Sequence, residues 1–229
     1  AEVYDPKADS WQPLPSMPSG RTCFAVAAVA GKVYTIGGEN GDYDSCFDTL
    51  EAYDLISGAW TRLASLPVAR SHHAATVVGG KIYVMGGSLA MSDHEDADEA
   101  TDRVDVYDPA ANSWQQMAAM PTPKSSHAAA VLGGKIYVTG GLLASTAECM
   151  DALDVYDPAA DTWTTLASLS QGRAYHASAV VKGKLCVFGG ELEDSARTNL
   201  VEVYSPASNS WTCAADLPFD IDQSAAVAL

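Results

Sequence analysis

The sequence is built from one repeated unit. Five tryptophans recur at spacings of 49, 54, 49 and 48 residues, at Trp11, Trp60, Trp114, Trp163 and Trp211. A tyrosine stands seven residues before each, at Tyr4, Tyr53, Tyr107, Tyr156 and Tyr204. A glycine pair keeps the same register in four units, at Gly37-Gly38, Gly86-Gly87, Gly140-Gly141 and Gly189-Gly190. Three anchors in fixed order indicate an array of one supersecondary unit, because self-similarity at such a period is the signature of repeat architectures.

One unit predicts four short strands. Residues 127–132 and 135–139 are two apolar runs separated by Gly133-Gly134, a pattern typical of a tight hairpin. A third run, residues 152–156, is broken by Asp157-Pro158, and an outer strand begins at Trp163. No window keeps an apolar stripe at helical spacing. The sequence therefore predicts an all-β fold of four-stranded antiparallel meanders.

The first strand of each unit is rich in alanine, which has a poor strand propensity. Strands that converge on a common axis explain this composition, because only short side chains fit where radially arranged sheets come closest. We therefore expect this strand to be the innermost of each sheet. The five runs begin at Phe24, His73, His127, His176 and Ser224.

An apolar strand, a Gly-Gly pair and a Tyr spaced before a Trp resemble the kelch repeat, and the match covers essentially the whole chain. The resemblance implies a kelch-type β-propeller of four-stranded antiparallel blades. A β-sandwich gives no reason for regular spacing over four intervals.

We expect residues 1–229 to form a single domain, which the repeat divides into blades. We expect a partial blade at 1–16, complete blades at about 21–65, 70–119, 124–168 and 173–216, and the inner strand of a next blade at 224–229. A closed five-bladed ring would lack one second strand and leave an open sheet edge near Leu229. Propellers of the family that the sequence resembles commonly have six blades, so we expect these residues to be a fragment of a longer ring.

The net charge and the spacing of the cysteines indicate which kinds of partner and which cellular compartment to expect. A formal net charge of -16 repels nucleic acid and anionic membranes, and no segment approaches 18 consecutive apolar residues. We therefore expect no nucleic-acid partner and no membrane. The five cysteines are scattered and lack C-x-x-C spacing, which favours reduced thiols in the cytoplasm.

Basic residues recur just before the inner strand, where the chain enters each blade, and are expected to surround the mouth of the channel. They are Arg21, Arg70, Lys124 and Arg173. Arginines on a concave surface bind carboxylates in bidentate geometry, so this ring suits an acidic peptide. In the kelch adaptors that the chain resembles, the matching residues line the peptide-binding face. The alternative is that each cation caps loop carbonyls of its own blade. Tyr43 and Tyr175 on the same face would add aromatic anchors.

A second basic ring lies in the hairpin turns of the opposite face, at Lys32, Lys81, Lys135 and Lys184. A Gly-Lys hairpin tip is ordinarily solvated and needs no ligand. If this face instead bound a neighbour, the propeller would serve as an assembly subunit of a larger complex.

No catalytic, metal or cofactor motif is found. His73, His127 and His176 share one repeat position, yet zinc requires ligands within about 2.1 Å, and inner strands of different blades do not converge that far. G-x-S-x-G and H-E-x-x-H are absent. The sequence predicts a non-catalytic module that binds a protein or peptide. If the parent chain carries a BTB or F-box segment, the resemblance implies a ubiquitin-ligase substrate receptor. The alternatives are an assembly subunit and a propeller enzyme, such as a copper-radical oxidase or a sugar-acid epimerase.

Overall fold

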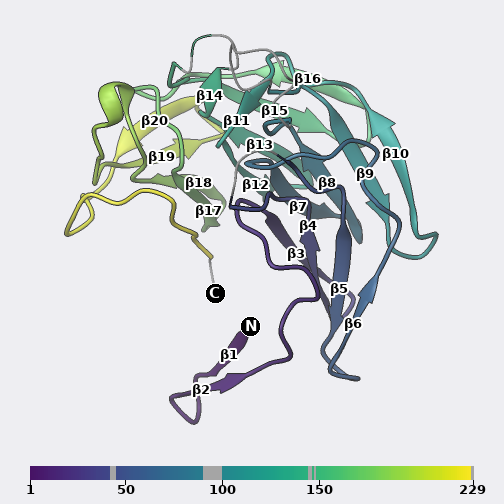
Figure 1. The fold of residues 1–229 in the computed structure, drawn as a ribbon. Helices are drawn as coiled ribbons and strands as arrows, with labels where there is room; N and C mark the ends of the chain where they lie inside the picture. The colour runs from purple at the N-terminus through teal and green to yellow at the C-terminus, as the bar shows by residue number, and fades with distance from the viewer. Residues whose placement is uncertain (42–44, 90–99, 144–145, 147, 228–229) are drawn as a thin grey trace.

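The computed structural model describes residues 1–41, 45–89, 100–143, 146 and 148–227. Apart from one 3-10 turn at Glu193–Ser195, the regular structure of these residues is β-strand. No helix in this part of the chain has the length and apolar character needed to cross a membrane. Four four-stranded antiparallel sheets fan out around a common centre in an open arc, and both chain ends lie at its open side (Figure 1). The expected all-β propeller fold is confirmed.

Each complete blade is a meander whose strands follow chain order from the centre outward. The first blade comprises β3 (Ala25–Val29), β4 (Lys32–Ile36), β5 (Leu50–Asp54) and β6 (Ala59–Arg62). The second comprises β7 (Ala74–Val78), β8 (Lys81–Met85), β9 (Val104–Asp108) and β10 (Ser113–Met117). The third comprises β12 (Ala128–Leu132), β13 (Lys135–Thr139), β15 (Leu153–Asp157) and β16 (Thr162–Thr165). The fourth comprises β17 (Ala177–Val181), β18 (Lys184–Phe188), β19 (Val201–Ser205) and β20 (Ser210–Cys213).

A short ladder precedes each inner strand and ties the entering chain to the residue after the glycine pair. In the third blade it is a two-stranded sheet of β11 (Lys124–Ser125) and β14 (Leu142–Leu143). In the other blades it is a single bridge: Thr22 to Glu39, Ser71 to Ser88, and Ala174 to Glu191. The ladder fixes the chain at the point where it turns onto the central axis.

The two ends of the chain are incomplete blades. β1 (Glu2–Asp5) and β2 (Ser10–Pro13) form a two-stranded sheet, which we call the N-terminal hairpin. The strand expected at 224–229 does not form at 224–227, while 228–229 lie outside the described residues. Ala226 and Val227 nevertheless line the central hollow of about 320 Å³ together with the four inner strands. The segment thus has the expected position, but no second strand to give it ladder hydrogen bonds.

The core lies between blades, where the repeated tyrosines and tryptophans meet. Tyr34 of the first blade packs against Tyr107 of the second with ring centroids 6.1 Å apart. The Trp114 indole N–H donates to the Ala64 carbonyl of the preceding blade at 2.8 Å, and Trp163 makes the same bond to Ala118 at 3.0 Å. Each Tyr-Trp pair therefore joins its blade to the one before it.

The glycine pair serves close contact between blades. Gly86 has φ +58°, and a Cβ there would lie 2.6 Å from the Lys124 carbonyl oxygen and 2.7 Å from His127 of the next blade. The N–H of Gly87 donates to that same Lys124 carbonyl at 3.0 Å. Only glycine combines this left-handed backbone with so close an approach.

Candidate functional site

The four basic residues expected at the mouth lie inside their own blades. Arg70 pairs with Asp105 at 2.6 Å, and Lys124 pairs with Asp154 at 2.9 Å. Equivalent pairs join Arg21 to Glu51 and Arg173 to Glu202, each at 2.5 Å. All four basic side chains are 0% exposed, so the expectation that they form an accessible binding ring is wrong.

The alternative, that the cations cap carbonyls of their own blade, is what the structure shows for the arginines. Arg21 Nη1 donates to the carbonyl oxygens of Gly37 (3.0 Å) and Thr49 (3.2 Å), and Arg173 Nη1 donates to that of Gly189 (3.1 Å). Burial lowers the pKa of the arginine guanidinium groups, and the paired carboxylates oppose that effect. The physical reason is the acid on the third strand, which points into the same enclosed space.

The sequence does contain a signal for these pairs. An acidic residue stands two positions before every repeated tyrosine, at Glu2, Glu51, Asp105, Asp154 and Glu202. Four of these acids are the buried partners of the four cations. Because buried charges are nearly always paired, two periodic sets of opposite charge predict internal pairs before they predict a surface.

The channel mouth is formed by the residues that stand two positions after each of the four cations, and by Gln223, two positions after Ile221, which occupies the cation position in the last repeat. We call this set the mouth residues: Cys23, His72, Ser126, Tyr175 and Gln223. All five have left-handed backbone, with φ between 48° and 53°. The N–H of each of the last four donates to the carbonyl of the preceding member at 2.8 or 2.9 Å. This chain of bonds brings the backbone of one residue from each repeat together, and four of the five residues line one cavity.

A polar cavity of about 270 Å³ lies among the mouth residues. Its walls include Ser71, His72 and Ser88 of the second blade, with Tyr175 and Gln223 from later repeats. The Tyr175 ring meets the His72 ring edge-on, with centroids 5.8 Å apart. Tyr175 is therefore at the site, as expected, whereas Tyr43 lies outside the described residues.

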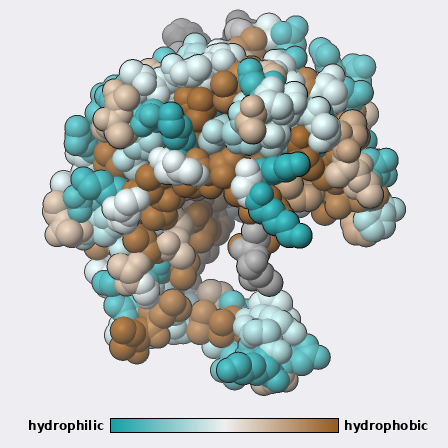
Figure 2. Space-filling view, turned by 180° about the vertical axis from the view of Figure 1, so that it is seen from behind, coloured by the Kyte–Doolittle hydropathy of each residue, from teal (hydrophilic) through white to brown (hydrophobic). Residues whose placement is uncertain are grey.

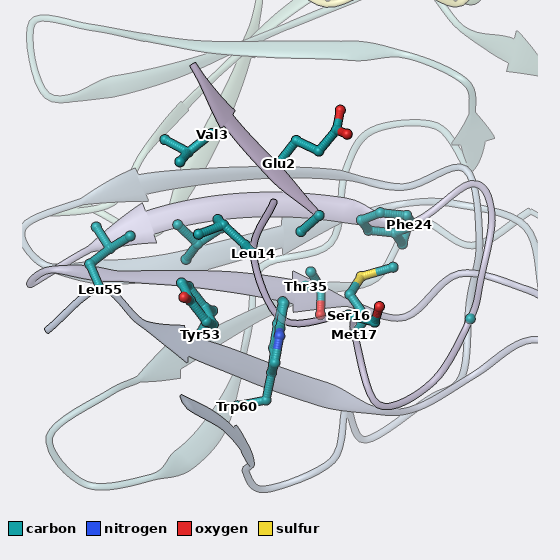
Figure 3. A pocket seen from close by; sticks show the side chains of 13 residues that line it. Glu2, Val3, Leu14, Ser16, Met17, Phe24, Thr35, Tyr53, Leu55 and Trp60 are labelled. Atoms are coloured by element: carbon teal, nitrogen blue, oxygen red, sulfur yellow. The ribbon is translucent and has the colours of Figure 1, made fainter. Parts of the chain in front are cut away.

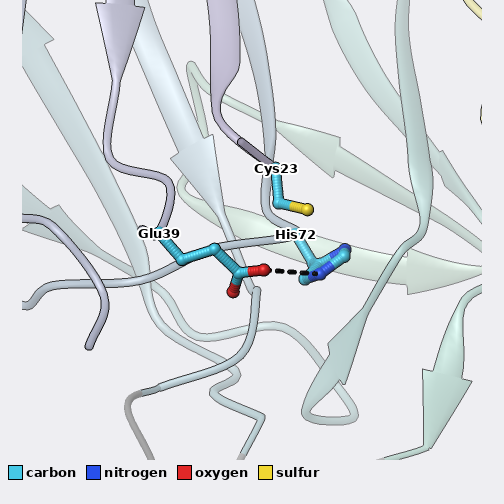
Figure 4. A group of neighbouring side chains, drawn as sticks. All are labelled: Cys23, Glu39 and His72. Atoms are coloured by element: carbon cyan, nitrogen blue, oxygen red, sulfur yellow. Dashed lines mark ion pairs between the residues drawn. The ribbon is translucent and has the colours of Figure 1, made fainter. Parts of the chain in front are cut away.

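Cys23, Glu39 and His72 cluster on one side of this cavity (Figure 4). His72 Nε2 lies 3.8 Å from Glu39 Oε1, and the Glu39 side chain is only 6% exposed. Glu39 Oε1 has no hydrogen-bond partner among the described residues. An enclosed carboxylate oxygen without a donor gives the cavity a negative, hydrogen-bond-accepting floor.

Among the residues that the structure describes, these three are the group of His, Cys, Asp and Glu side chains close enough together to hold a cation. Their ligand atoms lie within 4.8 Å of one another, whereas bonds of 2.0 to 2.3 Å to tetrahedral zinc place ligand atoms about 3.5 Å apart. The separation of His72 Nε2 and Glu39 Oε1, 3.8 Å, is slightly larger than in such a site. Burial and the Glu39 carboxylate raise the pKa of the Cys23 thiol, which makes it a poor nucleophile at neutral pH.

The three histidines at the start of the inner strands are fully enclosed. The ring nitrogens of His73 and His127 have no side-chain hydrogen-bond partner within the described residues, and His176 Nε2 lies 2.8 Å from Thr139 Oγ1. Burial lowers the pKa of all three to about 3, so they are neutral at physiological pH. Their Cε1 atoms pack on the first glycine of the preceding blade's pair. They are packing residues, not channel ligands.

The lysines of the opposite face pair locally and stay half exposed. Lys32, Lys81 and Lys135 lie 3.5, 3.1 and 2.9 Å from Asp54, Asp108 and Asp157, and their side chains are 44 to 48% exposed. Each pair joins the first residue of the second strand to the last residue of the third.

Known proteins that are similar to this chain include proteins with kelch repeats. The family model described as the KLHDC2/KLHL20/DRC7 Kelch-repeats domain matches residues 2–168 and 94–217. Kelch-like protein 24 of Rattus norvegicus is 45% identical over 144 residues, which cover 61% of this chain and 22% of that protein. Kelch-like protein 33 of Homo sapiens is 30% identical over 138 residues (60% and 15%), and alpha-scruin of Limulus polyphemus is 30% identical over 145 residues (63% and 16%).

The chain spans 15 to 22% of the length of these relatives. A solved structure of YjhT superimposes with a TM-score of 0.83 at 18% identity, and the match covers 95% of this chain and 77% of that one. With the repeat anchors, the four meander blades and the family model in agreement, the chain belongs to the kelch-repeat family of β-propeller proteins.

Proposed function

We propose that this propeller is a non-catalytic protein-interaction module that binds a loop or peptide of its partner at the channel mouth. The observation that carries the proposal is the variation of the mouth residues on a constant backbone. Their φ angles agree within a few degrees, while the five side chains are a thiol, an imidazole, a hydroxyl, a phenol and an amide. A rigid scaffold that presents different side chains from equivalent loops is the usual arrangement of a recognition surface.

The charge of the mouth favours a partner loop with a basic or hydrogen-bond-donating side chain. The four cations that would have attracted an acidic peptide are neutralised inside the blades. Glu39 offers a buried oxygen without a donor among the described residues, and the chain as a whole carries a net charge of -16. Opposite potentials guide association and select partners.

The buried cations contribute indirectly, because they hold the loops that lead into the mouth. Tyr175 contributes an aromatic ring, the residue type enriched at binding hot spots. The raised pKa of Cys23 argues against a thiol nucleophile, and the Kelch-like relatives favour an adaptor over an enzyme. Five free cysteines support a reducing compartment, which we take to be the cytoplasm. Delivery of a bound protein to a ubiquitin ligase would require a region outside residues 1–229.

A displayed library of constrained loops tests this proposal. Loops selected on the natural chain should be enriched in Lys or Arg and should lose at least about tenfold in affinity for the double variant Glu39→Gln/Tyr175→Ala, since each tenfold corresponds to about 1.4 kcal/mol of binding. Lys135→Ala on the opposite face is the control and should leave affinity unchanged.

Selected loops that bind the double variant as tightly as the natural chain would overturn the proposal. If those loops were lost on Lys135→Ala instead, the opposite face would be the binding surface and an assembly role would replace the adaptor role.

A further inference from the structure

Three side chains of the types that bind metal ions meet at the junction between the first two blades. Figure 4 shows the Glu39 carboxylate and the His72 ring pointing at each other beside the Cys23 thiol. Their ligand atoms lie within 4.8 Å of one another, and His72 Nε2 lies 3.8 Å from Glu39 Oε1. Tetrahedral zinc places its ligand atoms about 3.5 Å apart, so side-chain rotations that move an atom by at most about 1.3 Å would bring all three onto one ion.

The backbones of these three residues are tied together. Thr22, which precedes Cys23, exchanges two backbone hydrogen bonds of 3.0 Å with Glu39. The His72 N–H donates to the Cys23 carbonyl at 2.9 Å, and the Tyr175 ring meets the His72 ring edge-on. Ligands that the scaffold already holds lose little freedom when they bind, so the site is largely preorganised.

Glu39 supplies a second, independent observation. The residue is 5% exposed, and its Oε1 has no hydrogen-bond donor among the described residues. The 3.8 Å separation from His72 Nε2 is too long for a hydrogen bond. Because buried charges are normally paired or bound to a metal, this oxygen is available to a cation.

The fold does not require these three residue types. The equivalent positions are His72, Ser88 and Ser126 between the second and third blades, and Ser126, Leu142 and Tyr175 between the third and fourth. The entry ladder forms in those blades as well. Because serine and leucine are compatible with the same backbone, packing does not explain why a thiol, a carboxylate and an imidazole come together at the first junction.

A second, larger cavity has the wrong chemistry for a metal ion. It holds about 570 Å³ beside the N-terminal hairpin, and its walls are mainly apolar, with Leu14, Phe24 and Trp60 among them (Figure 3). Figure 2 shows hydrophobic side chains gathered around the opening between the body of the molecule and the segment below it. No histidine or cysteine of the described residues lines this cavity, whereas both line the polar cavity at the mouth.

We propose that Cys23 Sγ, Glu39 Oε1 and His72 Nε2 bind a zinc ion at the channel mouth, with the fourth coordination position open to the polar cavity. Mixed sulfur, nitrogen and oxygen ligands suit Zn²⁺, whereas Mg²⁺ and Ca²⁺ prefer oxygen ligands alone. As the Zn–S bond forms, the S–H bond of Cys23 breaks and its proton passes to the solvent. Water, or a histidine, thiol or carboxylate side chain of a partner, takes the fourth position.

Zinc at this position also regulates the mouth, a consequence that rests on the function proposed above. The ion neutralises Glu39, the carboxylate that attracts a Lys or Arg side chain of a partner loop. Zinc and a basic loop therefore compete for the same carboxylate. The metal site itself does not depend on loop binding.

Metal binding is tested on reduced, chelator-treated protein that carries no histidine tag. Cobalt(II), which occupies tetrahedral zinc sites, should bind one-to-one and give the sulfur-to-cobalt charge-transfer absorption of a thiolate ligand. Zinc should remove this absorption by displacing the cobalt. It should also raise the melting temperature, because it binds the folded state.

Matched variants locate the ligands. Cys23→Ser and Glu39→Ser introduce the residue type that the repeat carries at the equivalent positions Ser126 and Ser88, so both variants should fold. Each should weaken zinc binding by more than the roughly 10- to 100-fold typical of losing an outer-shell residue, and Cys23→Ser should also abolish the charge-transfer absorption. Cys149→Ser, at a half-buried cysteine of the third blade, is the control and should bind zinc as the natural chain does.

A dissociation constant for zinc above about 1 mM would overturn the proposal, as would a cobalt spectrum without thiolate absorption or equal weakening by Cys149→Ser. The competition is measured separately, with loops selected on chelator-treated protein: zinc should release them, and the same concentration of Mg²⁺ should not. Zinc binding without any selected loop would contradict the function proposed above and support the metal site. Selected loops without zinc binding would do the reverse.

Discussion

Arg173 illustrates how a charged residue in this fold serves the interior of its own blade. It is 0% exposed, and its charge is balanced by Glu202, which is 1% exposed. The position is not restricted to cations, because Ile221 stands there in the last repeat. A prediction based only on the positive charge of these residues put them on the surface. It missed their burial because the acid that pairs with each cation stands about 30 positions further along the chain.

Removing one partner of this pair should destabilise the fold strongly. Arg173→Met leaves the Glu202 charge buried and should lower the free energy of unfolding by about 3 to 5 kcal/mol. Arg173→Met/Glu202→Leu should recover much of the loss, since no isolated charge remains. Arg197→Met, which breaks a pair whose arginine is 62% exposed, is the control and should cost less than about 1 kcal/mol. Urea unfolding measures all three, and equal losses for the first and last variants would contradict the prediction.

The buried histidines should make the fold sensitive to mild acid. The pKa of His73, His127 and His176 is about 3 when folded and about 6.5 when unfolded, so the unfolded state binds more protons between these values. Their neutral forms stabilise the fold fully above pH 6.5, and this stability falls as pH is lowered toward 3, by up to about 1.4 kcal/mol per pH unit for each histidine.

His127→Gln cannot titrate in this range and should reduce the slope by about one third, because one of three such histidines is lost. Urea unfolding between about pH 6.5 and 5, above the range in which most carboxylates titrate, measures the slope. An unchanged slope would show that His127 is not excluded from protonation in the folded state.

At the scale of the strand, the glycine pairs and the tryptophans connect neighbouring blades, which, among the described residues, share no strand-to-strand hydrogen bonds of a common sheet. Every complete blade ends its second strand on a glycine pair, and the second glycine donates to a carbonyl at the entry to the next repeat. The sequence predicted the strands of the four complete blades and their order correctly, because apolar periodicity and glycine turns are local signals. It did not reveal the contact of Gly86 with His127, because that contact depends on how two blades meet.

Two glycines with nearly equal φ angles allow two contributions to the stability loss of a Gly→Ala change to be measured separately: backbone strain, and contact of the added Cβ with the next blade. Gly86 (φ +58°) faces the next blade, whereas a Cβ added at Gly79 (φ +59°) would meet nothing within 4 Å. Gly79→Ala should cost about 1 kcal/mol from the left-handed backbone alone. Gly86→Ala should cost at least about 3 kcal/mol, because overpacking adds to that strain. Similar melting temperatures for the two variants would exclude close packing at Gly86.

At the scale of the whole molecule, the net charge and its placement act together. Four of the thirteen basic residues and four of the 29 acidic residues are enclosed in ion pairs that cancel in charge, so the whole net charge of -16 remains on the other ionisable residues. Self-repulsion among exposed carboxylates opposes the compact state and is screened by salt.

The melting temperature should therefore rise as sodium chloride is increased from about 10 mM to 150 mM, over which the Debye length falls from about 30 to 8 Å. Potassium chloride should give the same rise, since screening depends on ionic strength. Glu193→Lys, at an exposed position of the 3-10 turn, should make the rise smaller. A melting temperature that falls with salt would mean that surface ion pairs outweigh the repulsion.

The amino-acid sequence by itself determined the repeat, the strand order, the register of the blades and the class of fold, because tryptophan spacing, glycine pairs and alternating strands are properties of the chain taken in order. The tertiary structure alone decided which side chains reach the channel mouth. Arg70 lies inside its blade, paired with Asp105, whereas His72, two residues later in the same loop and in left-handed backbone, lines the cavity at the mouth. That choice depends on the acid of the third strand and on the backbone bonds between neighbouring repeats, which form only once the blades are packed together.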